Sequence, residues 1–191
     1  MFNDRIEDIL KKTGTLLTGH FLLTSGRHSN QYMQCAKILQ YPHYAEELIM
    51  PLADSFEDDD VDLVLCPAVG GIIVAYELAR QMGVKNMYAE RENGRMTLRR
   101  GFAIEPGSRV LIAENVITTG GTVREVMEIV HEQGAEVAGV AVLIDRSMGS
   151  IDFGVKLSVT YTADVKSWDA ANCPLCRENK APLVKPGSRK N

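Results

Sequence analysis

The stretch Val110-Leu111-Ile112-Ala113-Glu114-Asn115-Val116-Ile117-Thr118-Thr119-Gly120-Gly121-Thr122 decides the fold of this 191-residue chain. Its first four residues are apolar, which is typical of a short strand buried on both faces of a sheet. Polar residues, hydroxyls and two glycines then turn the chain into a helix, which the spacing of apolar residues predicts over 122–133. A buried strand that turns directly into a helix predicts a layered α/β fold.

The same strand-to-helix pattern appears earlier in the chain. Strands are predicted at 63–66, 86–89, 109–113 and 136–144, loops at 67–71 and 114–121, and further helices at 4–12, 72–82 and from Pro42 onward. The stretch from His20 to Gln34 lacks such a pattern and is expected to be rich in loops. Strands alternating with helices predict a mostly parallel sheet flanked by helices, whose ligands bind at the carboxyl ends of the strands.

The composition excludes several classes of protein. With 45% hydrophobic and 24% charged residues the chain is typical of a globular protein, and its length favours a single domain. It has no apolar run of about 18 residues and no signal-peptide pattern, so we expect a cytoplasmic protein without a membrane partner. The net charge of −4 argues against a nucleic-acid partner, because binding to phosphate backbones needs a surplus of Lys and Arg.

The chain has four cysteines, and in a protein of this size that is expected to be cytoplasmic they do not indicate a disulfide scaffold. Only Cys173-Pro-Leu-Cys176 has the spacing of metal ligands. A zinc site needs a second pair of ligands, and neither Cys35, Cys66 nor any of the four histidines supplies an obvious one. We therefore expect no metal site built by the chain itself.

From the residues alone, the turn at 118–122 is a candidate phosphate site. Its backbone N–H groups, its threonine hydroxyls and the N-terminus of the following helix point toward one place. It has neither the Gly-Lys-Ser/Thr ending of a Walker A loop nor the Gly-x-Gly-x-x-Gly spacing of a dinucleotide site. The alternative interpretation is an N-capped turn with an incidental pair of threonines.

A second candidate feature is the segment between Tyr88 and Phe102. Asn93-Gly94 is a strong signal for a hairpin turn, so the segment is predicted to be a two-stranded flap over 90–101. Four arginines against two glutamates give residues 90–100 a net charge of +2. A solvated hairpin is the alternative to an anion-binding flap.

The stretch 110–122 resembles the phosphoribosyl-diphosphate (PRPP) signature of type I phosphoribosyltransferases. The resemblance implies that Glu114 and Asn115 contact the ribose hydroxyls and that the turn at 118–122 holds the 5-phosphate. The PRPP-binding residues implied in this way are Gly70, Gly71, Glu114, Asn115, Val116, Ile117, Thr118, Thr119, Gly120, Gly121 and Thr122. Asn115 departs from the family, which usually has Asp here, so one negative charge near the reacting sugar is lost.

Three further segments resemble orotate phosphoribosyltransferases, a branch of this family. His20-Phe21-Leu22-Leu23-Thr24-Ser25-Gly26-Arg27-His28-Ser29 is similar to their N-terminal motif, with Thr24 in place of a frequent Lys. This match implies that Tyr32 and Met33 lie beside the orotate ring. Leu143-Ile144-Asp145-Arg146 implies that Arg146, together with Thr118, binds orotate, because a guanidinium pairs with a carboxylate through two hydrogen bonds. Cys66-Pro67-Ala68-Val69-Gly70-Gly71-Ile72 matches the diphosphate loop, with Gly70 where some members have Lys; taken alone, its glycines also fit tight packing of a strand against a helix.

The resemblance also implies an architecture and partners. It implies a single phosphoribosyltransferase domain over 1–191, in which 1–40 and part of the C-terminus form a substrate hood and 90–101 form a flexible catalytic flap. In this enzyme class the flap covers the diphosphate and commonly reaches the neighbouring subunit of a homodimer, which makes Arg91 a candidate catalytic residue. Glu114 and Asn115 are the other two candidates, because the resemblance places them at the ribose. Mg²⁺ is expected to be held mainly by PRPP and water, with few protein ligands.

The implied reaction transfers the phosphoribosyl group of PRPP to orotate, which gives orotidine 5′-monophosphate and diphosphate in pyrimidine synthesis. A transferase for a purine or another base is the first alternative. Arg146 favours a pyrimidine with a carboxylate over this alternative, because its guanidinium can pair with the carboxylate. The second alternative is a PRPP-sensing regulator without catalytic activity, which Asn115 favours. Such regulators usually add a DNA-binding module or a basic face, and neither is visible in the first 60 residues.

Overall fold

The computed structural model describes residues 2–23, 26–179 and 181–186. The chain divides into two compact units, Met1–Gln40 with Asp164–Asn191, and Tyr41–Ala163. The boundary at Gln40 coincides with the end of the segment 1–40 that was expected to form a substrate hood. The role of this segment as a hood stays a prediction. Within the described ranges, no helix has the length and apolar character needed to cross a membrane.

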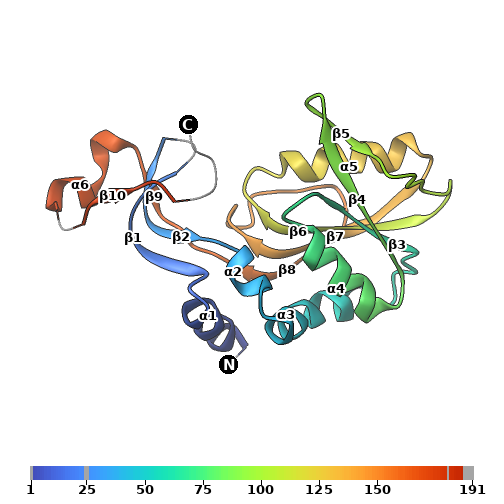
Figure 1. The fold of residues 1–191 in the computed structure, drawn as a ribbon, viewed down its shortest axis with the longest axis horizontal. Coiled ribbons are helices and arrows are strands. Elements are labelled where there is room, and N and C mark those ends of the chain that lie inside the picture. The colour runs from blue at the N-terminus through green and yellow to red at the C-terminus, as the bar shows by residue number, and fades with distance from the viewer. Residues whose placement is uncertain (1, 24–25, 180, 187–191) are drawn as a thin grey trace. The chain divides into compact units, whose positions relative to one another are not determined.

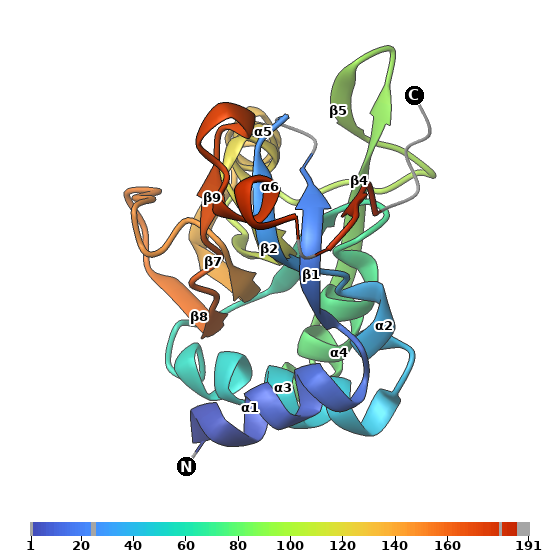
Figure 2. The ribbon, with the colours of Figure 1, turned by 90° about the vertical axis from the view of Figure 1, so that its left-hand side faces the viewer.

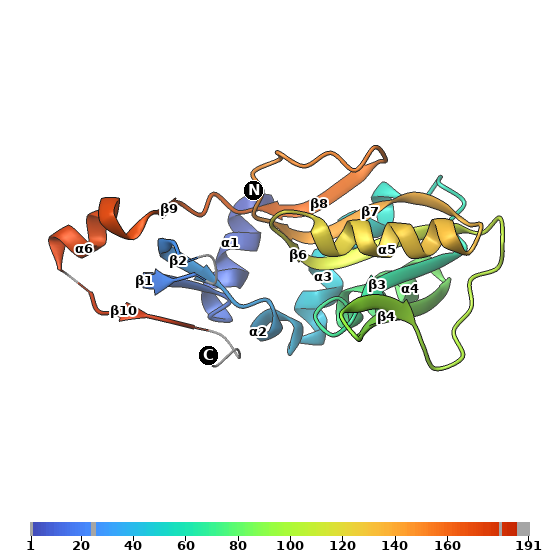
Figure 3. The same ribbon diagram turned by 90° about the horizontal axis from the view of Figure 1, so that it is seen from above.

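The unit Tyr41–Ala163, here called the sheet unit, is a layered α/β structure. Its elements are α3 (Pro42–Ser55), β3 (Leu63–Pro67), α4 (Ile72–Met82), β4 (Lys85–Glu92), β5 (Arg95–Leu98), β6 (Arg109–Ile117), α5 (Gly121–Glu132), β7 (Glu136–Asp145) and β8 (Leu157–Thr162). The strand order is β5-β4-β3-β6-β7-β8, and every pairing is parallel except that of β4 with β5. Figures 1 and 3 show α5 on one face of this sheet and α3 and α4 on the other. The predicted mostly parallel sheet flanked by helices is confirmed.

The central strands β3, β6 and β7 form the core of the sheet unit. All five residues of β3 are buried, and residues 110–113 of β6 are fully buried. Burying an aliphatic side chain of this size stabilises the fold by roughly 1.5–3 kcal/mol, so these apolar runs supply much of the driving force for folding. The core therefore fixes the ends of β3, β6 and β7, from which the loops of the candidate site emerge.

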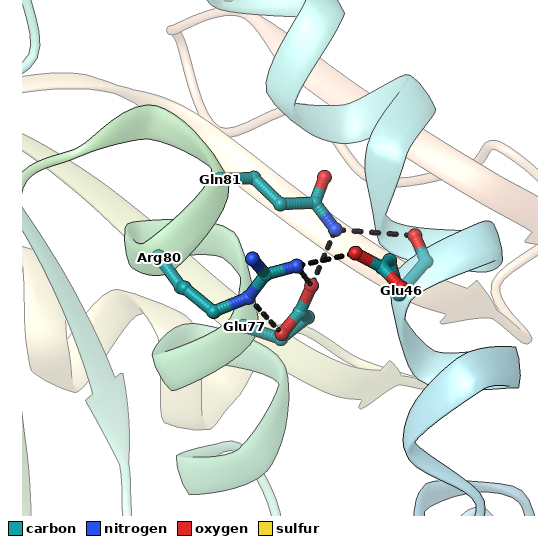
Figure 4. A network of polar contacts seen from close by, with 4 residues as sticks. All are labelled: Glu46, Glu77, Arg80 and Gln81. Carbon is teal, nitrogen blue, oxygen red and sulfur yellow. Dashed lines mark hydrogen bonds and ion pairs between the residues drawn. The ribbon is translucent and has the colours of Figure 1, made fainter.

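A network of polar side chains joins α3 to α4 on the surface of the sheet unit (Figure 4). The guanidinium of Arg80 donates to both carboxylate oxygens of Glu77 at 2.8 and 2.9 Å and to Glu46 of α3 at 2.7 Å. The side-chain amide of Gln81 donates to the backbone carbonyl of Glu46 at 3.1 Å. The hydrogen bond from Arg80 lowers the pKa of Glu77, so the carboxylate stays charged in this network.

The other unit, here called the terminal unit, contains both ends of the chain. Its elements are α1 (Phe2–Lys12), β1 (Leu16–Leu22), β2 (His28–Met33), α2 (Ala36–Leu39), β9 (Ser167–Trp168), the 3-10 turn η1 (Ala170–Asn172), α6 (Pro174–Glu178) and β10 (Leu183–Val184). Its sheet has the order β10-β1-β2-β9, so strands from the C-terminal segment pair with both edges of the β1–β2 hairpin. Figure 2 shows α6 in front of β1 and β2.

Two predictions about local structure were wrong. The stretch from His20 to Gln34 was expected to be loop-rich, but most of it lies in the β1–β2 hairpin, which pairs Leu16 with Met33. The loop predicted at 114–121 begins later, because β6 continues through Ile117 along β7. In both cases pairing with a neighbouring strand holds polar residues in an extended conformation that their own propensity does not favour.

Gly139 of β7 makes the close packing of the sheet unit testable. A Cβ atom at this position would lie 2.4 Å from Cε1 of Phe56 and 2.8 Å from the carbonyl oxygen of Lys156. Phe56 is itself buried, so neither neighbour can move away freely. We expect Gly139→Ala to lower the free energy of unfolding by about 1–3 kcal/mol, measured by urea denaturation. Gly107→Ala adds a methyl group where no atom lies nearby, so it is the control for a methyl group that meets no neighbour. Its φ of +82° means that any loss of stability in this control comes from backbone strain and not from packing. An unchanged midpoint for Gly139→Ala would contradict the packing.

Candidate active site

The end of β6 delivers a buried carboxyl group to the turn that precedes α5. The side chain of Glu114 is only 7% exposed, although it can carry a charge. Burial raises its pKa to about 7, and a hydrogen bond from the backbone N–H of Asn115 to Oε1 at 2.9 Å acts in the opposite direction. A carboxyl group poised between its two protonation states is typical of a functional site.

The turn after β6 forms a small pocket with polar walls. The residues around it are Glu114, Val116, Ile117, Thr118, Thr119, Gly120, Gly121, Thr122 and Val123. Gly120 has a φ of +75°, and a Cβ there would lie 2.9 Å from the ring of Phe153, so only glycine fits. Gly120 is also the N-cap of α5, and among the described residues no side-chain hydrogen bond caps this helix, so its first N–H groups are available to a ligand. The three threonines of the turn are exposed at this helix N-terminus, an arrangement that suits a phosphate group.

The loop between β3 and α4 meets the end of β6 at two glycines. A Cβ on Gly71 would lie 3.0 Å from the carbonyl oxygen of Pro67 and 3.3 Å from that of Ala113, so the backbones approach each other closely here. A Cβ on Gly70 would lie 3.0 Å from Nδ2 of Asn115. The two segments implied to bind PRPP, the 66–72 loop and the 110–122 stretch, are therefore in contact.

Glu114 and Asn115 were expected to face the ribose together, but their side chains have different neighbours. Both lie within β6, where successive side chains point to opposite faces of the sheet. Glu114 lines the pocket of the threonine turn, whereas the amide of Asn115 lies against Gly70 of the other loop. The two residues therefore connect the two halves of the candidate site.

Arg146 follows the end of β7, and its backbone N–H donates to the carbonyl of Ile117 at 2.9 Å. This contact brings Arg146 to the same edge of the sheet as the threonine turn. The carboxylate of Asp145, which is 1% exposed, accepts hydrogen bonds from the N–H groups of Ser147 at 2.6 Å and Gly149 at 2.9 Å and so fixes the turn. Nε of Arg146 and Oγ of Ser147 are both buried without a hydrogen-bond partner among the described residues. Buried polar atoms are rarely left unpaired in proteins, so these two atoms are available to bind a ligand or a water molecule.

Ser147 was missed by the sequence analysis. The signal that could have found it is its position, since it directly follows Arg146 after a predicted strand, where polar side chains reach the ligand-binding edge.

The flap is a β-hairpin, as predicted. Asn93 and Gly94 both have positive φ angles, +51° and +85°, as expected for the tight turn between β4 and β5. The guanidinium of Arg91 donates to Glu125 of α5 at 2.7 Å and to the carbonyl of Gly94 at 2.6 Å. The other three flap arginines also pair with glutamates: Arg95 with Glu132, Arg99 with Glu92 and Arg100 with Glu90. Exposed ion pairs of this kind contribute little stability, so an anionic ligand can compete for these arginines.

Cys66, at the end of β3, is not a candidate nucleophile. Burial and the nearby charge of Glu114 raise the pKa of its thiol to about 12. The reactive form of cysteine is the thiolate, so this side chain remains an inert thiol in the core.

The residues implied to contact the orotate ring lie in the terminal unit. Tyr32 is half-buried, and its ring centroid lies 5.9 Å from that of Phe21, whereas Met33 is only 6% exposed. As neighbours on β2 they point to opposite faces, so the two cannot lie against the same face of a planar ligand. Arg27 is held by Ser167 and by Asp169 at 2.6 Å. Thr24 and Ser25 lie outside the described residues.

Comparison with known proteins shows the family to which the chain belongs. The family model described as "Phosphoribosyl transferase domain" matches residues 36–169. The chain is 57% identical over 190 residues to an orotate phosphoribosyltransferase of Pelotomaculum thermopropionicum, with 100% of both chains covered, and 52% identical over 189 residues to one of Desulforamulus reducens, with 99% of this chain and 98% of the relative covered. The crystal structure of orotate phosphoribosyltransferase from Aeropyrum pernix superposes with a TM-score of 0.72 at 27% identity and covers 82% of this chain and 93% of that one. The family model covers more than half of the chain and the relatives match it over nearly its full length, so the chain belongs to the orotate phosphoribosyltransferase family.

Proposed function

We propose that the protein transfers the phosphoribosyl group of PRPP to orotate and releases orotidine 5′-monophosphate and diphosphate, as a step of pyrimidine synthesis in the cytoplasm. The observation that carries this proposal is a pair of buried polar atoms, Nε of Arg146 and Oγ of Ser147, which lack a hydrogen-bond partner in the described part of the chain and follow the strand next to the threonine turn. Orotate has a carboxylate that a guanidinium binds well, whereas adenine offers no such group. The turn supplies the second requirement, a site for the 5-phosphate of the ribose.

In the proposed reaction, a ring nitrogen of orotate forms a bond to the anomeric carbon of PRPP and gives up its proton to the solvent or to the departing diphosphate. The bond from that carbon to the diphosphate breaks, and the diphosphate leaves with the electron pair. The sugar carries positive charge in the transition state, so the carboxylate of Glu114 near the ribose stabilises it. The threonine turn and Arg146 hold the two reactants in line, and none of these residues needs to form a covalent bond to the substrate.

The residues of this site fit Mg²⁺ bound together with PRPP. Glu114 is the carboxyl group that lines the threonine-turn pocket, and its raised pKa makes it a weak ligand on its own. Mg²⁺ usually keeps several waters and binds through phosphate oxygens and one or two carboxylates, which this donor set permits. When bound, the ion neutralises charge on the diphosphate leaving group.

The flap and the terminal unit complete the proposal. Arg91 exchanges Glu125 for the diphosphate when the flap closes over the substrate, which also excludes water from the reacting sugar. The flap acts on the neighbouring active site of a homodimer, as in the family. The contact of Tyr32 and Met33 with the orotate ring stays a prediction of the resemblance.

Asn115 provides the test of catalytic competence. Its amide lies against Gly70, where an aspartate of the same shape fits and restores one negative charge. We expect the natural chain to consume orotate in the presence of PRPP and Mg²⁺, and Asn115→Asp to raise kcat by about tenfold or less through stronger stabilisation of the sugar cation. The loss of orotate absorbance measures both rates.

The same assay separates the alternatives. If neither chain consumes orotate although PRPP binds, as measured by calorimetry, the regulator interpretation replaces the proposal. If adenine, guanine or hypoxanthine is consumed and orotate is not, the protein is a transferase for another base. If Asn115→Asp is active and the natural chain is not, Asn115 is a disabling change in an intact site.

A further inference from the structure

Four potential metal ligands converge in the terminal unit, outside the candidate active site. His20 lies on β1, His28 on β2, and Cys173 and Cys176 lie at the start and within α6. One ligand atom from each of the four lies within 4.8 Å of the others. Both histidines and Cys173 are at most 5% exposed, and Cys176 is exposed. The second ligand pair that the sequence did not reveal is therefore the pair of histidines on the β1–β2 hairpin.

The distances within this cluster match the edges of a tetrahedron around one ion. Nε2 of His20 lies 3.1 Å from Nδ1 of His28, 3.5 Å from Sγ of Cys173 and 3.6 Å from Sγ of Cys176. Sγ of Cys176 lies 3.2 Å from Nδ1 of His28. A tetrahedral zinc ion with ordinary Zn–N and Zn–S bonds separates two nitrogens by about 3.3 Å and a nitrogen from a sulfur by about 3.6 Å. The four atoms are thus already close to a zinc-binding arrangement.

Hydrogen bonds alone do not explain this cluster. Nε2 of His20 faces three heteroatoms, although a neutral ring nitrogen has only one proton or one lone pair to share. The other ring nitrogen, Nδ1, lies 3.3 Å from the backbone carbonyl of Ala181. If Nδ1 carries the proton and donates it to this carbonyl, the lone pair of Nε2 is directed at the cluster, as in metal sites where a second hydrogen bond orients the histidine.

The described residues of the C-terminal segment after β9 bury few side chains. Neither η1 nor α6 has a buried residue of its own, and both residues of β10 are exposed. Among the described residues of this segment, Cys173 is the one whose side chain is buried, with 1% exposure. A unit of about 70 residues has a small core, and proteins of this size commonly add a metal or disulfides for stability.

We propose that His20, His28, Cys173 and Cys176 bind one structural zinc ion, which ties the C-terminal segment to the β1–β2 hairpin. Two thiolates and two imidazoles suit zinc and not the oxygen-preferring Mg²⁺ of the phosphoribosyl site. All four positions are filled by protein, so the ion has no open site for substrate and its role is structural. The resulting Cys₂His₂ site would join residues that are more than 150 positions apart in the chain.

The first experiment measures metal binding by the full chain. Protein purified under reducing conditions and dialysed against metal-free buffer is expected to retain about one zinc per chain by elemental analysis. Exchange with Co²⁺ is expected to give the intense visible absorption of a tetrahedral thiolate site. Removal of zinc with a strong chelator is expected to lower Tm by about 10 °C.

A matched pair of cysteine variants tests the assignment of ligands. Cys176→Ser changes one exposed atom, so it is expected to fold, yet to bind zinc about 100-fold or more weakly and to lose the effect of the chelator on Tm. Cys35→Ser also removes one thiol, from a position outside the cluster, and is expected to keep both the zinc and the effect of the chelator. Because each variant is compared with and without chelator, any general destabilisation cancels.

Three results would overturn the proposal. The first is metal-free protein in which both cysteines react as thiols and added zinc does not bind. The second is a bond between Cys173 and Cys176, seen as the loss of two hydrogens in the mass of the unreduced protein. The third is zinc binding that Cys176→Ser and His28→Ala leave unchanged. None of these results bears on orotate turnover, so the proposed zinc site and the proposed function are tested independently of each other.

Discussion

Replacing Arg146 by alanine will lower kcat/KM for orotate by about 100-fold, mainly through a higher KM for orotate. The backbone of Arg146 is fixed by its position after β7 and by the hydrogen bond from its N–H to the carbonyl of Ile117. The buried Nε of its guanidinium has no hydrogen-bond partner among the described residues. Losing one side of a buried, charge-assisted pair costs about 2–5 kcal/mol of binding, which corresponds to roughly 30-fold to several thousand-fold. Steady-state kinetics with orotate and PRPP varied separately measures the effect.

Stability separates this functional role of Arg146 from a structural one. A buried donor without a partner in the folded protein costs free energy, so Arg146→Ala is expected to leave the urea midpoint unchanged or slightly higher. Arg146→Lys keeps the charge but loses the planar fork and is expected to recover only part of the affinity for orotate. Arg5→Ala removes an exposed guanidinium from α1 and serves as the control. If Arg146→Ala raised KM for PRPP as much as KM for orotate, the assignment to the carboxylate would be wrong.

The sequence predicted the sheet unit well because its signals are local. The buried apolar runs of β3, β6 and β7 and the turn at Asn93-Gly94 depend on neighbours in the sequence, and the structure contains all of them. The turn from β6 into α5 was also predicted, since it depends on a short stretch of residues, and its role in phosphate binding stays a prediction.

The features that were missed depend on contacts between distant parts of the chain. β6 extends through Ile117 because Glu114 pairs with Val142 and Ile117 with Asp145 of β7. Polar residues such as those of β2 form a strand because β1 and β9 supply the partners. The four-residue cluster of the terminal unit joins positions from both ends of the chain, so spacing within the sequence could reveal only the Cys173–Cys176 half of it.

Glu114→Gln is expected to make the protein more stable and less active. Below about pH 4.5 the carboxyl group is protonated in both the folded and the unfolded chain, so it adds no pH dependence. Between that value and its raised pKa of about 7, the unfolded chain has released the proton while the folded chain keeps it, so stability falls as the pH rises. Above pH 7 the full cost of about 3 kcal/mol is present, at roughly 1.4 kcal/mol per pKa unit.

Glutamine avoids this cost because it cannot ionise, and it keeps an oxygen for the hydrogen bond from the N–H of Asn115. Urea denaturation is therefore expected to show Glu114→Gln more stable than the natural chain by up to about 3 kcal/mol at pH 8, with the difference shrinking toward pH 5. Glu57→Gln, at an exposed position, is the control for replacing a carboxyl group by an amide. Equal curves for Glu114→Gln and the natural chain would mean that the carboxyl group is already solvated.

The same substitution is expected to lower kcat by about 100-fold, because glutamine offers no negative charge to the sugar as positive charge develops on it. The two effects have one cause, the placement of an ionisable group where water is largely excluded. Excluding water makes the carboxylate costly in the free protein, and it also strengthens its attraction to a cationic sugar. A carboxyl group kept only for packing would lose neither stability nor turnover when replaced by an isosteric amide, so opposite changes in the two quantities are the signature of a catalytic Glu114.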